Sequence, residues 1–225
     1  VCSQLMNKYN VNKIIFSSTA TVYREDNTLP FTEESVLGTT NPYSTSKLMV
    51  ERIIQDNYVS NKNFSSVILR YFNPIGAHPS GLIGESPSGI PNNLMPYIIK
   101  VANKEIDHLS IFGDDYPTKD GTGVRDYIHI MDLVEGHVLA LDKLDENGVH
   151  IYNLGADKGY SVLEVVNTFQ RANNIKINYK IVDRRPGDMA EFYADSSKAY
   201  KELGWKAKHT LREMCKDAWK FGKIE

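Results

Sequence analysis

Three consecutive segments decide the fold: KIIFSS (13–18), NPYSTSKLMVERIIQDNY (41–58) and SSVILRYFNP (65–74). The first and third are short apolar runs bounded by polar residues, which is typical of buried parallel strands. In the second, Asn41 can act as a helix N-cap, Pro42 fits the first helical position, and apolar residues recur at helical spacing. A strand, a helix and a strand in this order predict a βαβ unit, and with it an α/β fold built on a parallel sheet.

The rest of the chain alternates short helices and strands. Helices are expected at 93–104, 131–144, 161–173, 196–203 and 210–222, and strands at 109–113, 127–130, 150–155 and 176–182. Two helices begin with a capping box, Ser161 with Glu164 and Thr210 with Glu213. Residues 75–92 are rich in Gly, Pro and Ser, and a loop of this length in a compact domain favours a binding loop over an unstructured one.

The composition argues against several classes of protein. The 225 residues are 41% hydrophobic and 24% charged, and the net charge of −2 gives no reason to expect nucleic acid or an anionic membrane as partner. The two cysteines, Cys2 and Cys215, lie far apart in the chain, which argues against a disulfide scaffold or a zinc site and favours a cytoplasmic protein. No apolar run has the length of a membrane span.

The first ten residues, VCSQLMNKYN, place Val1, Leu5 and Met6 on one side of a helix that has no N-cap residue ahead of it. The sequence does not begin with Met, and no glycine-rich turn after a first strand occurs in it. We therefore expect an N-terminal region to be missing. The alternative is a natural start with a processed Met and a frayed first turn.

Tyr43 and Lys47 stand four residues apart on the expected helix, so they share one face. A phenol is a poor base at neutral pH because its pKa is about 10, but a neighbouring ammonium favours the phenolate. The pair is a candidate for acid–base catalysis. By itself it is weak evidence, because Tyr-x-x-x-Lys also occurs by chance on exposed helices.

Small hydroxyl residues follow the first expected strand: Ser17, Ser18, Thr19 and Thr21. Ligands of open α/β sheets bind at the carboxyl ends of the strands. A hydroxyl there can hold a substrate oxygen and pass its proton to a phenolate. The alternative is that these residues only form the turn that leaves the sheet.

Two asparagines and two arginines are candidates for binding a ligand. Asn73 and Asn93 offer donors and acceptors that suit phosphate, uracil or sugar groups, although an Asn at position 93 is more often only a helix cap. Arg125 and Arg185 could hold a diphosphate, because a guanidinium matches phosphate geometry. Considered singly, each arginine is more often part of a surface ion pair.

Together these motifs resemble the UDP-glucose 4-epimerase family of extended short-chain dehydrogenases/reductases. The resemblance extends from near Val1 to about Trp219 and is carried by SSTATVY, PYSTSK, RYFNPIGAHPSG, GIPNNLMPY, IFGDDYPTKDGTGVRDYIHIMDL, IYNLG and RRPGD. It implies the C-terminal part of a doubly wound parallel (Rossmann-type) sheet plus a smaller α+β substrate-binding domain. Residues 1–75 would be the C-terminal half of the NAD-binding domain. Residues 76–225 would mainly bind the UDP-sugar, with about 126–155 returning to the first domain.

The resemblance also implies a role for each candidate residue. Tyr43 would be the general base and acid, Lys47 would bind the nicotinamide ribose and tune Tyr43, and Thr19 would hold the sugar 4-hydroxyl. Ser17 and Phe72 would lie on the cofactor side. The UDP-sugar would be surrounded by Asn73, Asn93, Leu94, Phe112, Arg125, Tyr127, Val162, Arg185, Asp188 and Phe192.

The implied reaction is the NAD-dependent interconversion of UDP-glucose and UDP-galactose, a step of galactose metabolism, through a 4-keto intermediate and without a metal ion. A bulky Phe192 beside the 2-position of the sugar favours these substrates over the N-acetylated pair. Members of the family are commonly homodimers, and helices at 1–9 and 43–58 would form the contact.

The chain departs from the family pattern at Thr19, where Ser is usual, and at Arg24, where Gly follows Val-Tyr. The hydroxyl survives at the first position, and the second indicates an altered surface loop. A 4,6-dehydratase would need an acid/base pair directly after Thr19, where this chain has Ala20 and Thr21. Without the glycine-rich dinucleotide motif, we expect the 225 residues alone to be inactive and poorly soluble; the alternative function is a non-catalytic UDP-sugar-binding fragment.

Overall fold

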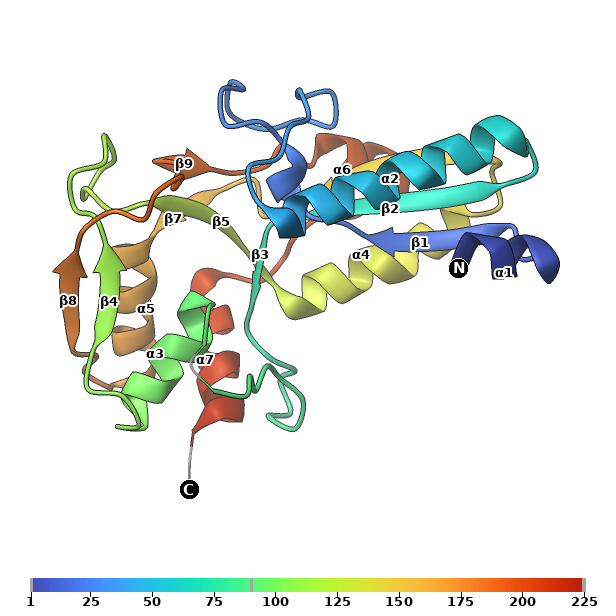
Figure 1. Cartoon of the computed structure of the whole chain (residues 1–225). Coiled ribbons are helices and arrows are strands. Elements are labelled where there is room, and N and C mark those ends of the chain that lie inside the picture. Colours follow the sequence, from blue (N-terminus) through green and yellow to red (C-terminus); the bar gives the residue numbers. More distant parts are fainter. Residues whose placement is uncertain (1, 90, 224–225) are drawn as a thin grey trace. The chain divides into compact units, whose positions relative to one another are not determined.

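The computed structural model describes residues 2–89 and 91–223 and divides the chain into two compact units (Figure 1). Unit 1 comprises Val1–Phe72, Val134–Leu154 and Ala194–Lys206, and unit 2 comprises Asn73–Leu133, Gly155–Tyr193 and Ala207–Glu225. Val1, which the sequence assigned to the first helix, lies outside the described residues. No helix in the described part of the chain combines the length and the apolar character needed to cross a membrane.

Unit 1 is built on a parallel sheet with the strand order β1-β2-β6. The strands are β1 (Lys13–Ser17), β2 (Ser65–Tyr71) and β6 (Gly148–Leu154), and all of their pairings are parallel. Strand β2 lies in the middle and is buried along almost its whole length. This explains its uninterrupted Val-Ile-Leu run, because a central parallel strand is covered on both faces. The α/β fold with a parallel sheet is confirmed.

Helices cover this sheet. The elements of unit 1 outside the sheet are α1 (Cys2–Lys8), the short 3-10 helix η1 (Ala20–Val22), α2 (Pro42–Ser60), the part of α4 (Ile130–Lys143) from Val134 onward, and α6 (Ser197–Leu203). Figure 1 shows α2 and α4 along opposite sides of β1 and β2. A Cβ on Gly136 of α4 would come within 2.7 Å of the Leu154 side chain, so a glycine is needed for α4 to approach β6 this closely.

Unit 2 contains a mixed sheet and a separate strand pair. Strand β5 (Val124–His129) pairs in parallel with β3 (Asn73–Ile75) and β9 (Glu191–Phe192) and antiparallel with β7 (Gly159–Ser161). The separate pair is β4 (Leu109–Phe112) with β8 (Tyr179–Val182), in parallel. Three helices complete the unit: α3 (Leu94–Ala102), α5 (Val162–Asn173) and α7 (Leu211–Gly222).

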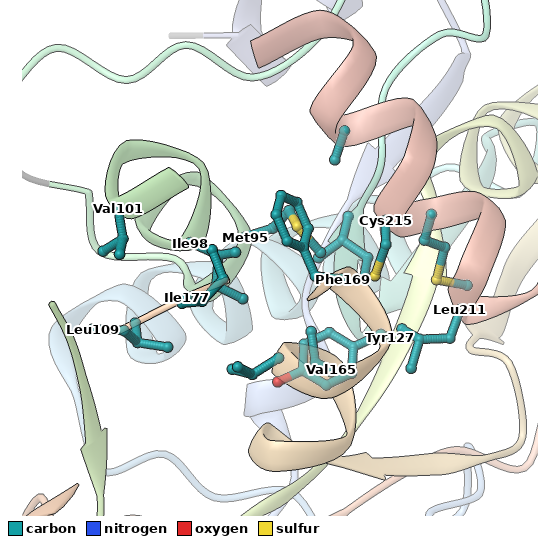
Figure 2. Packing of buried hydrophobic residues seen from close by; sticks show 14 of the residues in the cluster. Met95, Ile98, Val101, Leu109, Tyr127, Val165, Phe169, Ile177, Leu211 and Cys215 are labelled. Carbon is teal, nitrogen blue, oxygen red and sulfur yellow. The ribbon is translucent and has the colours of Figure 1, made fainter. Parts of the chain in front are cut away.

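The core of unit 2 forms where these helices meet. Figure 2 shows Met95 of α3, Phe169 of α5 and Cys215 of α7 converging in one apolar cluster, with Tyr127 of β5 beside them. Both predicted capping boxes are present and begin α5 and α7. These caps fix where each helix starts, and the apolar faces then pack against one another.

Two of the differences between the structure and the predicted segments concern strand β3 and the return of the chain to unit 1. We expected one strand over 65–74 that ends at Pro74, but β2 ends at Tyr71 and Pro74 lies within a new strand, β3. Among the strands in the described part of the chain, β3 pairs only with β5, so it is an edge strand, where a proline that lacks an N–H group is tolerated. Residues 194–206 also belong to unit 1, whereas the chain was expected to return to this part only at about 126–155.

Candidate active site

The hydroxyl residues at the end of β1 are linked to the start of α2. Thr19, which is only 6% exposed, caps η1: its Oγ1 accepts a hydrogen bond from the Thr21 amide at 3.2 Å. The buried Ser44 of α2 donates a hydrogen bond of 2.7 Å to Thr21 Oγ1. Thr19 therefore occupies a defined place beside the first turn of the helix that carries Tyr43.

Tyr43 and Lys47 lie on one face of α2, as their spacing predicted. The Lys47 Nζ donates a 2.8 Å hydrogen bond to the carbonyl oxygen of Ser17 and lies 5.7 Å from the centroid of the Tyr43 ring. Within residues 2–89 and 91–223, Lys47 forms no ion pair with a carboxylate, so its charge remains available to act on the phenol. The Tyr43 side chain is accessible, since 54% of it is exposed.

Two further titratable side chains lie close to this pair. Burial raises the pKa of the Tyr71 phenol, the nearby Tyr43 raises it further, and the Ser17 hydroxyl opposes the shift. The Ser17 Oγ lies 2.9 Å from Nε2 of His137, which belongs to α4. Sequence reasoning gave neither Tyr71 nor His137 a role. Tyr71 stood in a quoted motif, but no local pattern connects His137 with a strand end 120 residues away.

Unit 2 contains a cavity of about 290 Å³ that brings most of the predicted substrate residues together. Nine of them line it: Asn73, Asn93, Leu94, Phe112, Arg125, Tyr127, Val162, Arg185 and Asp188. The lining also includes residues that sequence reasoning did not select: Pro74, Ile75, Asn92, Tyr97, Leu109, Ser110, Ile111, Tyr116 and Gly123. Several of these adjoin selected residues within the motif segments, as Pro74 adjoins Asn73 and Asn92 adjoins Asn93.

Two guanidinium groups give this cavity a positive character. The Arg185 guanidinium lies 3.8 Å from the centroid of the Phe112 ring. Arg125 is held by the carbonyl oxygens of Val124 and Met189, each at 2.8 Å, and its Nη2 lies 3.6 Å from Asp188 Oδ1. Two cations beside aromatic and apolar walls suit a ligand with both a phosphate and a planar ring.

Tyr127 contributes a neutral wall to the cavity. Burial raises the pKa of its phenol to about 12, and the charge of Arg125 only partly opposes this shift. Tyr127 therefore stays protonated at physiological pH.

Asn93 does not act as the helix cap that its position favours. It precedes α3, yet its side chain forms no capping hydrogen bond; instead, its Nδ2 donates to Glu85 Oε1 at 2.8 Å. The preceding loop packs largely against α7, because Lys220 donates to the carbonyl of Pro79 and a Cβ on Gly84 would collide with the Phe221 ring. Among residues 76–89, 91 and 92, which the structure describes, only Asn92 lies in the lining of the cavity, next to Asn93.

The remaining predicted positions lie outside this lining. Phe192 is 9% exposed and is the partner of Arg125 in the β5–β9 ladder. Phe72 is buried and precedes the first residue of unit 2. The Arg24 side chain is 52% exposed and forms an ion pair with Asp26.

One family model and several relatives of known name match this chain. The family model described as GDP-mannose 4,6 dehydratase matches residues 2–218. UDP-glucose 4-epimerase of Bacillus subtilis is 55% identical over 222 residues, which are 98% of this chain and 66% of that protein. The enzyme of Haemophilus influenzae is 56% identical over 225 residues, 99% of this chain and 67% of that protein.

Solved structures give the same result. The UDP-glucose 4-epimerase of Bifidobacterium longum, in complex with NAD+ and UDP, is similar with a TM-score of 0.93 at 55% identity, and the match covers 97% of this chain and 66% of that one. The Stenotrophomonas maltophila enzyme, with bound NAD and formylated UDP-arabinopyranose, has a TM-score of 0.95 at 45% identity, covering 98% and 66%. The chain thus spans about two thirds of the length of these relatives. By sequence and by fold, it belongs to the UDP-glucose 4-epimerase family.

Proposed function

We propose that the protein carrying these residues interconverts UDP-glucose and UDP-galactose with NAD as cofactor, by transient oxidation at C4 of the sugar. The observation that carries this proposal is the Lys47 ammonium, which has no carboxylate partner in the described part of the chain and lies 5.7 Å from the Tyr43 ring centroid. The relatives solved with NAD and UDP or a UDP-sugar support it.

The proton chemistry is assigned to Tyr43, Lys47 and Thr19. The Lys47 charge favours the phenolate form of Tyr43, which then removes the proton of the sugar 4-hydroxyl. Thr19 holds that hydroxyl through its own Oγ1. After the 4-keto sugar has turned, the Tyr43 phenol returns a proton to the oxygen at C4.

The side chains around Lys47 fit the nicotinamide ribose of NAD. An ammonium has three hydrogens to donate, and Lys47 has one hydrogen-bond acceptor among the described residues, the Ser17 carbonyl. Lys47 therefore retains donors for ribose hydroxyls, and Ser17 and Phe72 would complete this part of the site. When bound, NAD⁺ supplies the chemistry of accepting a hydride from C4 and giving it back.

Binding of the UDP group is assigned to the cavity of unit 2. Arg125 and Arg185 would hold the diphosphate, and Asn73, Asn93, Phe112 and Tyr127 would surround the nucleoside. Because the two guanidinium groups bind the part of the molecule that does not react, they would keep the 4-keto intermediate bound while its sugar turns.

The test is the conversion of UDP-galactose by the purified protein, compared with its Tyr43→Phe variant. We expect the variant to lose about 10²–10⁴-fold in kcat while UDP binding persists, since only proton transfer is removed. Tyr58→Phe is a matched control on the same helix, because Lys62 Nζ lies 4.2 Å over that ring and gives a second Tyr–Lys pair. Equal turnover by Tyr43→Phe and wild type would contradict the proposed base.

For residues 1–225 by themselves, we expect UDP-sugar binding without turnover, because their sequence contains no glycine-rich turn for the NAD pyrophosphate. Turnover of UDP-galactose by this purified polypeptide with added NAD⁺ would contradict that expectation.

We further propose a cytoplasmic homodimer with contacts through α1 and α2. Met49 and Ile53 of α2 support it, since 61% and 50% of these apolar residues are exposed. Light scattering of the purified protein tests the dimer.

A further inference from the structure

A fully buried ion pair joins α2 to the central strand of unit 1. The side chains of Arg70 on β2 and Glu51 on α2 are 1% and 0% exposed. The contact is bidentate: Arg70 Nε donates to Glu51 Oε1 at 3.1 Å, and Nη2 donates to Oε2 at 2.7 Å. A buried pair of this kind is weak evidence for stability, because well-packed apolar residues often serve as well. The role of the two charged groups is therefore indicated by the segments of the chain that they bind.

On one side, the pair holds the end of β1. The buried Ser18 hydroxyl donates a hydrogen bond to Glu51 Oε1, and Ser18 stands between Ser17 and Thr19. Successive turns of α2 thus contact the last residue of β1 and the segment that follows it: Lys47 contacts the carbonyl of Ser17, Glu51 contacts Ser18, and Ser44 contacts Thr21.

On the other side, the pair holds the residue that follows η1. Arg70 Nη1 donates to the Tyr23 hydroxyl at 3.1 Å, and its guanidinium lies 5.0 Å from the centroid of that ring. Tyr23 in turn donates to Asn153 Oδ1 of β6 at 2.6 Å. Residues 18–23, which include Thr19, are consequently held at both ends by one ion pair.

We propose that Glu51 and Arg70 are positioning residues for the reaction, because they fix the segment 18–23 and so the place of the Thr19 hydroxyl beside Tyr43 and Lys47. This inference rests on the proposed function, in which Thr19 holds the sugar 4-hydroxyl. Glu51 acts through Ser18, and Arg70 acts through Tyr23 and by neutralising Glu51. Neither residue lines the cavity of unit 2, so UDP binding does not depend on them.

The test uses two changes in the protein that carries this chain. Ser18→Ala removes the hydrogen bond to Glu51 and leaves the ion pair intact. The double variant Glu51→Leu/Arg70→Met replaces the pair by apolar side chains of similar volume, which preserves packing but offers Ser18 no acceptor. The matched control is Arg52→Met/Asp56→Leu, which removes an exposed ion pair of 3.5 Å from the same helix.

We expect kcat to fall about 10–100-fold in both variants, because small displacements of reacting groups have effects of that size, while KM for UDP-galactose and Kd for UDP stay unchanged. The control should keep the wild-type kcat. If the pair only stabilises the fold, a double variant with the wild-type Tm will also have the wild-type kcat. That result would overturn the proposal. Should the double variant fail to fold, a wild-type kcat in Ser18→Ala would overturn it equally.

A second measurement does not depend on turnover. Amide hydrogen exchange of residues 19–23 should be at least about ten-fold faster in both variants and unchanged in the control, because this segment would lose its anchor. If exchange is faster in the variants but the wild-type protein does not convert UDP-galactose, the proposed function is wrong and the anchoring is right. Unchanged exchange in Ser18→Ala and in the double variant would overturn the anchoring itself.

Discussion

Arg125 and Phe192 are direct partners in the parallel ladder between β5 and β9. Arg125 lines the cavity and Phe192 does not, so the pairing places Phe192 one strand away from a residue of the lining. We expect Phe192→Cys to raise kcat/KM for UDP-N-acetylglucosamine about ten-fold or more, since the smaller side chain makes room for an acetamido group. Steady-state kinetics with both UDP-sugar pairs measure this change.

The control for this prediction is Phe192→Tyr, which keeps the size of the ring and should not broaden the range of substrates. Turnover of UDP-galactose should change little in either variant, because the proton chemistry is assigned to other residues. An unchanged kcat/KM for UDP-N-acetylglucosamine in Phe192→Cys would contradict the assignment of this position to specificity.

The elements with local signals were predictable from the sequence. Helix α2 begins where the Asn41 and Pro42 pattern placed it, and Asn41 accepts a hydrogen bond from the Ser44 amide. Both capping boxes formed for the same reason, since a cap involves only residues three positions apart. Strands β7 and β9, with three and two residues, were missed because they are too short for any periodicity to emerge.

The candidate site was predictable only in part, because some of its contacts join residues that are far apart in the sequence. Eight of the nine selected residues in the cavity lining lie within the quoted motif segments, and the ninth, Val162, was selected through the family resemblance alone. Arg70 opens one of the quoted segments but received no role, since nothing local connects it with Glu51, its partner 19 residues away. Asn93 was selected as a ligand-binding residue, and the alternative reading, a helix cap, is not observed because its side chain donates to Glu85 in the folded loop.

The Arg185 guanidinium over the Phe112 ring leads to a prediction about nucleotide affinity. Arg185→Lys keeps the charge but loses the planar group that lies 3.8 Å from this ring centroid. We expect Kd for UDP to rise about ten-fold, because the stacked contact and the fork geometry for phosphate are both lost. Isothermal titration calorimetry with UDP measures it.

Arg184→Lys is the matched control for that experiment. Arg184 is the preceding residue, is paired with the exposed Asp115, and is absent from the cavity lining. Its variant should bind UDP with wild-type affinity. Equal losses of affinity in both variants would mean that Arg185 has no special contact with the nucleotide.

Cys215 should be chemically inert in the folded protein. It is fully buried in the core of unit 2, and burial raises the pKa of its thiol to about 12. We expect modification of Cys215 by a thiol reagent at pH 8, followed by mass spectrometry of the peptide that contains it, to be about 10³-fold slower than in denaturant. Similar rates in the two conditions would contradict the burial of Cys215.

The stacked imidazoles of His129 and His209 predict a loss of stability in acid. Their ring centroids are 4.2 Å apart, and His129 is fully buried. Its Nδ1 accepts a hydrogen bond from the Met131 amide, and its Nε2 lies 3.2 Å from Asp217 Oδ2, so the neutral ring is satisfied. Burial and the charge of His209 lower the pKa of His129 below 6.5, and the opposing carboxylates of Asp217 and Asp132 do not reverse this shift.

Because the unfolded chain binds this proton more readily, the contribution of His129 to stability is complete above pH 6.5 and declines as the pH falls below it. We expect the free energy of unfolding to fall with a slope of at most about 1.4 kcal/mol per pH unit from this one group. Urea denaturation at several pH values between 7.5 and 5 measures the slope, which should be smaller in His129→Gln. The control is His150→Gln, the same substitution at a partly exposed histidine whose Nε2 lies 3.1 Å from the carbonyl oxygen of Glu146. An equal slope in His129→Gln and wild type would assign the acid sensitivity to other groups.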